Sequence, residues 1–194
     1  MRVLAAAAIA VALLAPAGSA QTNPNPSAFG VVVGWAENFY TSAVAFSPTL
    51  ILTYSESLEG GVAYSAQFGG KTYPTIIRCM SDFEGIDGSL VVFQTQSPLP
   101  ARLPTSARPL TEGEPLLIVG WTDGGNTMTQ LRGFYTFAVR RFHLVRQLSS
   151  PLLPGMIGAT VLDRRQTVVA VVADRNVLGD AVIVPLVGNN CGIP

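Results

Sequence analysis

The sequence predicts an all-β fold made of two β-barrels. Short runs of β-type residues, separated by Gly, Pro and Asn turns, fill both halves of the chain, with about six runs in each half. A Pro-rich stretch over residues 97–109 separates the halves, and its prolines exclude both regular helix and central strand. No segment shows a helical period with caps. Together these observations favour two barrels over an α/β fold.

The first 20 residues have the features of a secretory signal peptide. Arg2 precedes an apolar run over residues 3–14, and small residues over 17–20 suit a cleavage site. The run is shorter than the roughly 20 residues needed to cross a bilayer, and no other segment is long and apolar enough. We expect cleavage after Ala20 and a secreted or periplasmic protein that does not span the membrane. An uncleaved N-terminal anchor is the alternative.

Residues 21–28 are rich in Pro and Asn and predict an extended leader. The first barrel is expected over residues 29–96, a linker over 97–112, the second barrel over 113–188 and a C-terminal tail over 189–194. The first barrel's strands are predicted at 29–35, 42–46, 50–53, 62–68, 75–80 and 90–95. Those of the second barrel are predicted at 116–121, 128–139, 143–148, 159–162, 167–173 and 181–186. The apolar runs 31–33 and 168–172 fit strands that are buried on both faces.

Composition narrows the function further. Lys plus Arg and Asp plus Glu each number 12, so the formal net charge is zero and nothing indicates a nucleic-acid partner. Hydrophobic residues make up 48 % of the chain, which excludes intrinsic disorder. Cys79 and Cys191 are the only cysteines, and in an oxidising compartment they allow one disulfide, with two free thiols as the alternative. With a single histidine, His143, they do not make a zinc site, so we expect neither metal nor cofactor.

Three segments resemble motifs of the trypsin/chymotrypsin-like serine protease superfamily. Residues 43–53 (AVAFSPTLILT) resemble the segment that leads to the catalytic histidine. Residues 87–93 (DGSLVVF) resemble the segment that opens with the catalytic aspartate, and residues 153–159 (LPGMIGA) resemble the Gly-x-Ser-Gly-Gly nucleophile loop. Their order and spacing are similar to those of the short HtrA-like branch. The resemblance covers residues 29–187 and implies two six-stranded antiparallel barrels with a cleft between them.

The resemblance also implies that the catalytic positions are degenerate. The family's chemistry needs a hydroxyl nucleophile, an imidazole base and an orienting carboxylate. Asp87 retains the carboxylate, but Glu56 stands at the histidine position and Ile157 at the nucleophile position. We therefore expect a proteolytically inactive homologue, a chain that is not an enzyme and that acts by binding a protein or peptide.

The loop around the nucleophile position keeps part of its pattern. Gly155, Met156 and Gly158 are interpreted as a remnant of the oxyanion loop, in which backbone N–H groups bind developing negative charge. Ile157 is expected to act as an apolar plug in the cleft. Tyr54, just before the degenerate site, is a candidate to line a peptide groove.

Other interpretations stay open at this point. A hydrolase with a rearranged site would use His143 or the Glu56/Asp87 pair, since two carboxylates in one cleft can share a proton. The same pair can bind a hard cation through its oxygens. A purely structural exported domain is a further alternative.

Overall fold

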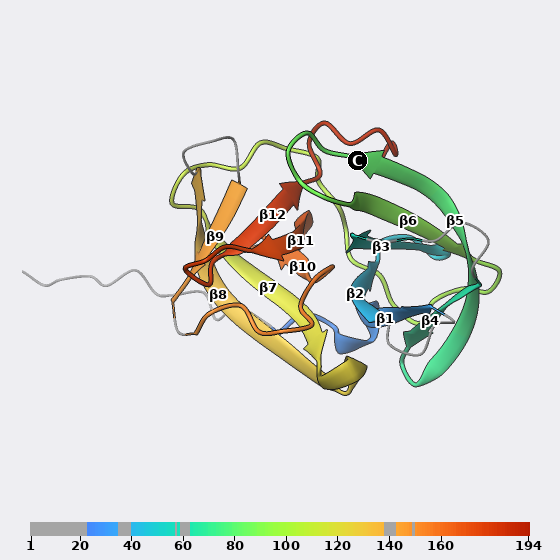
Figure 1. The fold of residues 1–194 in the computed structure, drawn as a ribbon. Coiled ribbons are helices and arrows are strands. Elements are labelled where there is room, and N and C mark those ends of the chain that lie inside the picture. Colours follow the sequence, from blue (N-terminus) through green and yellow to red (C-terminus); the bar gives the residue numbers. More distant parts are fainter. Residues whose placement is uncertain (1–22, 35–39, 57, 59–62, 138–142, 149) are drawn as a thin grey trace, which may run out of the picture.

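The structure is a computed structural model that describes residues 23–34, 40–56, 58, 63–137, 143–148 and 150–194. It contains two closed barrels of six antiparallel strands each, so the predicted all-β fold is confirmed. The two halves of the chain form barrels that lie side by side (Figure 1). The predicted signal peptide over residues 1–20 lies outside the described residues. No helix in the described part of the chain is long and apolar enough to span a membrane.

The first barrel closes in the order β1-β2-β3-β6-β5-β4. Its strands are β1 (Phe29–Gly34), β2 (Tyr40–Ala45), β3 (Leu50–Ser55), β4 (Tyr64–Phe68), β5 (Lys71–Asp82) and β6 (Ser89–Thr95). Large apolar side chains fill the interior, among them Val32, Ile51, Phe68 and Phe93, each at most 1 % exposed. β5 is longer than the predicted strand because its first part pairs with β4 and its second part with β6.

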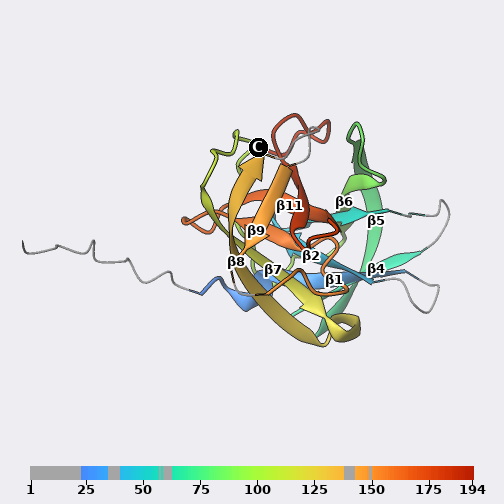
Figure 2. The same cartoon turned by 60° about the vertical axis from the view of Figure 1, so that its left-hand side comes forward.

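The second barrel closes in the order β10-β11-β12-β9-β8-β7. Its strands are β7 (Pro115–Thr122), β8 (Thr127–Phe137), β9 (His143–Gln147), β10 (Thr160–Leu162), β11 (Val168–Arg175) and β12 (Ala181–Pro185). A short 3-10 turn, η2 (Asp123–Gly125), joins β7 to β8. In both views β8 and β9 lie on the side of the molecule away from β4 and β5 (Figures 1 and 2).

A third apolar cluster joins the two barrels. Phe29 and Leu52 of the first barrel pack in one cluster with Val119 and Val171 of the second. Residues 168–173 of β11 are wholly buried, because one face of the strand fills the second barrel and the other faces this cluster. The shared cluster gives the barrels a defined relative position, and with it the shape of the cleft between them.

The linker is hydrogen-bonded to both barrels. The N–H of Leu103 donates to the carbonyl of Ala45 in β2, at 2.9 Å. One residue later, the carbonyl of Pro104 accepts from the N–H of Val168 in β11, at 2.8 Å. The Pro-rich stretch therefore forms an ordered connection that contacts the first barrel and then the second.

The leader differs from the extended segment expected from its sequence. Residues 26–28 form a 3-10 turn, η1 (Pro26–Ala28), directly before β1. The side chain of Asn25 caps this turn by accepting a hydrogen bond from the N–H of Ser27 at 3.0 Å, and Pro26 suits the first helical position. Ala28 is wholly buried against the cluster between the barrels, which fixes where the chain enters β1.

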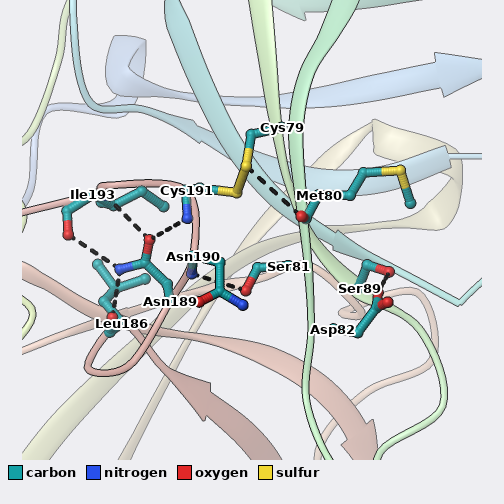
Figure 3. The surroundings of a disulfide bond; sticks show 10 residues. All are labelled: Cys79, Met80, Ser81, Asp82, Ser89, Leu186, Asn189, Asn190, Cys191 and Ile193. Carbon is teal, nitrogen blue, oxygen red and sulfur yellow. Dashed lines mark hydrogen bonds between the residues drawn. A yellow bond between two sulfur atoms is a disulfide. The ribbon is translucent and has the colours of Figure 1, made fainter.

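A disulfide joins Cys79 of β5 to Cys191 of the C-terminal tail, 112 residues apart in sequence, with 5.7 Å between their Cα atoms (Figure 3). The expectation that these cysteines pair is confirmed. Beside the disulfide, the N–H of Asn190 donates to the hydroxyl of Ser81 at 3.1 Å. The side chain of Asn189 holds the tail's own turn through bonds to neighbouring backbone groups (Figure 3). The end of the second barrel is thus tied to the first.

Candidate functional site

A cavity of about 750 Å³ lies where the two barrels meet. The first barrel contributes the residue after β3 and the β5–β6 hairpin, and the second contributes β9, the end of β11, the loop after it, and β12. The lining residues are Glu56, Gly85, Ile86, Asp87, Leu144, Asp174, Arg175, Asn176, Val177 and Val182. This volume lies within the range of ligand-binding cavities.

The structure brings Glu56 and Asp87 to this one cavity. The two lie close together because Gly88, which follows Asp87, packs directly on the end of β3. A Cβ atom on Gly88 would lie 2.6 Å from the Ser55 carbonyl oxygen and 2.8 Å from the Glu56 Cα. Gly88 also has a φ of +106°, a conformation that disfavours other residues. The hairpin can therefore approach β3 this closely only with glycine at position 88.

Tyr54 does not line the cavity, in contrast to its expected role in a peptide groove. Its side chain is wholly buried in the cluster between the barrels, because β3 has the barrel interior on one face and the second barrel on the other. The hydroxyl donates to the Asp87 backbone carbonyl at 2.5 Å and so holds the hairpin on β3. Burial raises the pKa of Tyr54 above its ordinary value. Four carboxylates raise it further, in this order: Glu56, Asp87, Asp174 and Asp82.

Ile157 sits beside these residues through its backbone. Its carbonyl accepts the N–H of Ser42 at 3.1 Å and lies 3.0 Å from the hydroxyl of Thr41. The same hydroxyl lies 2.8 Å from the carbonyl of Tyr54, so Thr41 links the loop of the second barrel to β3 of the first. The half-buried Ile157 side chain packs against the cluster between the barrels and is not among the residues that line the cavity. It therefore contributes to the barrel interface instead of plugging this cavity.

The predicted oxyanion-loop remnant keeps two glycines with positive φ, Gly155 at +85° and Gly158 at +77°. Two of its N–H groups are used within the second barrel. Met156 donates to the carbonyl of Leu153 at 3.3 Å, and Gly158 donates to that of Val172 at 2.8 Å. The Met156 side chain is wholly buried in the core of the second barrel. These two N–H groups are therefore not directed at a ligand in the cleft.

His143 lies on β9 and is not among the residues that line the cavity. Its Nδ1 is 2.7 Å from the hydroxyl of Tyr135, and the ring of Phe137 packs edge-on against it. Burial lowers the pKa of His143, which favours the neutral imidazole over the charged one. The only histidine of the chain is thus part of a local pair on the second barrel and does not line the cavity with Glu56 and Asp87.

The second barrel's side of the cavity was not predicted. Asp174, Arg175, Asn176 and Val177 follow the apolar run of β11 and form one side of the cavity. A polar segment that begins where a wholly buried strand ends is the signal that points to such residues. Among the residues that the structure describes, no three His, Cys, Asp or Glu side chains are grouped so as to hold a metal ion.

Comparisons with known proteins match the structure but not the sequence. No family model matches the chain, and no curated protein matches it. Among solved structures, it is similar to the Rv3671c protease from M. tuberculosis in its active form, with a TM-score of 0.69, 16 % identity and coverage of 87 % of this chain and 79 % of that chain. The inactive form of the same protease gives a TM-score of 0.68 at 16 % identity, covering 87 % of both chains.

These comparisons correct one expectation. The substitutions at positions 56 and 157 led us to expect a chain that is not an enzyme. That expectation is contradicted, because the similar structures are proteases and one of them is in an active form. The expected fold is confirmed: the chain has the two-barrel fold of the trypsin-like serine proteases.

Proposed function

We propose that this protein binds an extended peptide segment in the cleft between its barrels. The observation that carries the proposal is the cavity of about 750 Å³, to which both barrels contribute side chains. Cavities of this kind, formed where two structural units meet, are common ligand sites.

The free edge of β11 supports an extended ligand. β10 pairs with β11 only as far as Val171, and the backbone of Val172 bonds to Gly158 and Ala159. Beyond that point β11 continues to Arg175 with β12 as its only partner among the described strands. Asp174 and Arg175 line the cavity, so a peptide there could add to this edge through backbone hydrogen bonds.

Selection from a random octapeptide library tests the proposal, with affinities measured by fluorescence anisotropy. The matched variants are Val177→Arg and Leu178→Arg, which place the same long charged side chain at two exposed positions of one loop. Only Val177 lines the cavity. We expect Val177→Arg to weaken binding of the selected peptides at least tenfold and Leu178→Arg to change it less than twofold. Equal effects of both variants, or no selectable peptide, would refute the proposal.

Hydrolysis of the bound peptide is a second candidate function. It is favoured by the two carboxylates of Glu56 and Asp87, which line the cavity where a peptide would lie. Carboxylates that face a bound peptide can act as general bases toward water in hydrolysis. Mass spectrometry of a selected peptide after incubation would detect cleavage. Cleavage that persists unchanged in both Glu56→Gln and Asp87→Asn would exclude this mechanism, as would a peptide that stays intact.

We also propose that the protein is exported. The composition of residues 1–20 and the disulfide between Cys79 and Cys191 support a route into an oxidising compartment. The mass of the protein recovered outside the cytoplasm should correspond to a chain that begins at Gln21. Recovery of the uncleaved chain from the cytoplasm alone would contradict the proposal.

A further inference from the structure

Apolar side chains from both barrels line part of the cavity. Leu144 and Val182 of the second barrel, each 7 % exposed, are buried lining residues, and the first barrel contributes Ile86. Val177 lines the cavity from the loop after β11 and is fully exposed, more so than any other large apolar side chain described. An apolar side chain of a ligand would cover this surface and exclude water from it.

Asn176 holds this loop in place. Its side-chain oxygen accepts the N–H groups of Leu178 and Asp180, each at 2.9 Å. Its backbone N–H donates to the carbonyl of Asp180 at 3.0 Å. The exposed position of Val177 is thus set by the loop before a ligand arrives, which lowers the entropy lost on binding.

Negatively charged side chains line the same cavity. Glu56, Asp87 and Asp174 line the cavity and are exposed. Arg175 is the only cationic side chain among the lining residues, and its guanidinium donates to the Leu152 carbonyl at 3.2 Å. The lining therefore carries two negative charges in excess.

The three carboxylates all lie close enough to Tyr54 to act on its hydroxyl. All three contribute to the raised pKa of the buried Tyr54 hydroxyl, which lies behind the Asp87 backbone. Their negative potential therefore reaches the space between the barrels, where the Tyr54 hydroxyl lies. A cationic group placed in this space is attracted by several carboxylates at once.

We infer that the peptide ligand is basic, with a Lys or Arg side chain next to a large apolar one. The apolar side chain would contact Leu144, Val182 and Val177, and the cationic one would lie among the carboxylates. Charge complementarity selects this ligand over an acidic or uncharged peptide. The inference rests on the proposed peptide-binding function and specifies its ligand class.

The octapeptide selection tests this inference through its sequence preference. We expect enrichment of Lys or Arg within two positions of Leu, Ile, Phe or Met. In a selected peptide, Lys→Gln should weaken binding about two- to fivefold and Lys→Glu more than tenfold. Both losses should shrink as the salt concentration is raised, because salt screens exposed charges.

Protein variants supply the reciprocal test. Asp174→Asn and Glu56→Gln should each weaken binding of the selected peptide about two- to fivefold, with no change for its Lys→Gln version. The control is Asp123→Asn, which neutralises a carboxylate at an exposed turn outside the cavity and should leave peptide binding unchanged. Selected peptides that lack basic residues, yet lose affinity in Val177→Arg, would overturn this inference and leave the proposed function standing. Peptides insensitive to Val177→Arg would overturn both.

Discussion

Removing the disulfide between Cys79 and Cys191 should lower the free energy of unfolding substantially. The two residues are 112 positions apart, so the disulfide restricts a long loop of the unfolded chain. The chain-entropy relation gives about 4.7 kcal/mol for a loop of about 100 residues. For a chain of this size, a loss of about 4–5 kcal/mol lowers Tm by roughly 8–20 °C.

The assay is urea unfolding of the wild type and of the double variant Cys79→Ser/Cys191→Ser, each with and without reductant. Reduction should destabilise the wild type to the level of the double variant and leave the double variant unchanged. A loss below about 1 kcal/mol, the size of an ordinary point substitution, would refute this prediction, because it would mean that the disulfide does not restrict the unfolded chain. A reductant effect on the double variant would show that the treatment acts elsewhere.

Three further predictions concern the site and its supports. Gly85→Ala and Gly88→Ala both place alanine at positive φ, a conformation that disfavours it. Only Gly88 packs against the end of β3. Chemical denaturation should show about 1–3 kcal/mol more loss for Gly88→Ala, and equal losses would contradict the packing. Ser42→Ala removes the hydroxyl that accepts the backbone N–H of Trp121 at 2.8 Å and should cost about 1–3 kcal/mol. A loss under 0.5 kcal/mol, on the order of an ordinary surface change, would argue against this link between barrels. Burial lowers the pKa of His143 in the folded state, so the unfolded chain takes up the proton first as the pH falls. The contribution of His143 to stability should be complete above the unfolded pKa near 6.5 and should decline below it, by at most about 1.4 kcal/mol per pH unit. His143→Gln should flatten this dependence between pH 5 and 7, and an unchanged slope would contradict the assignment of the pH dependence to His143.

The barrels could be predicted because each strand carries its own local signal. The wholly buried run of β11 was visible as consecutive valines and alanines, and the prolines of the linker marked the boundary between the halves. The length of β5 was not visible, because its ends depend on pairing first with β4 and then with β6. The presence of a strand can be predicted from the local pattern of residues, whereas the positions of its ends depend on partner strands that are distant in sequence.

The site was predictable only in part, for the same reason. Glu56 and Asp87 were found by their place in motifs, and they do share a cavity. Tyr54 lies two residues before Glu56, yet it is wholly buried, because β3 has packed neighbours on both faces. The contribution of Asp174 and Val177 arises only when the second barrel docks on the first. Tertiary contacts therefore decide which side chains line the cleft.

Binding of an extended peptide between the barrels should change the backbone at the end of β11. Amide hydrogen exchange, followed residue by residue with and without a selected peptide, measures this change. We expect protection to increase at residues 173–177 and 85–87, which line or border the cavity. Protection confined to other surfaces, such as the outer face of β5, with no change at these residues, would contradict it.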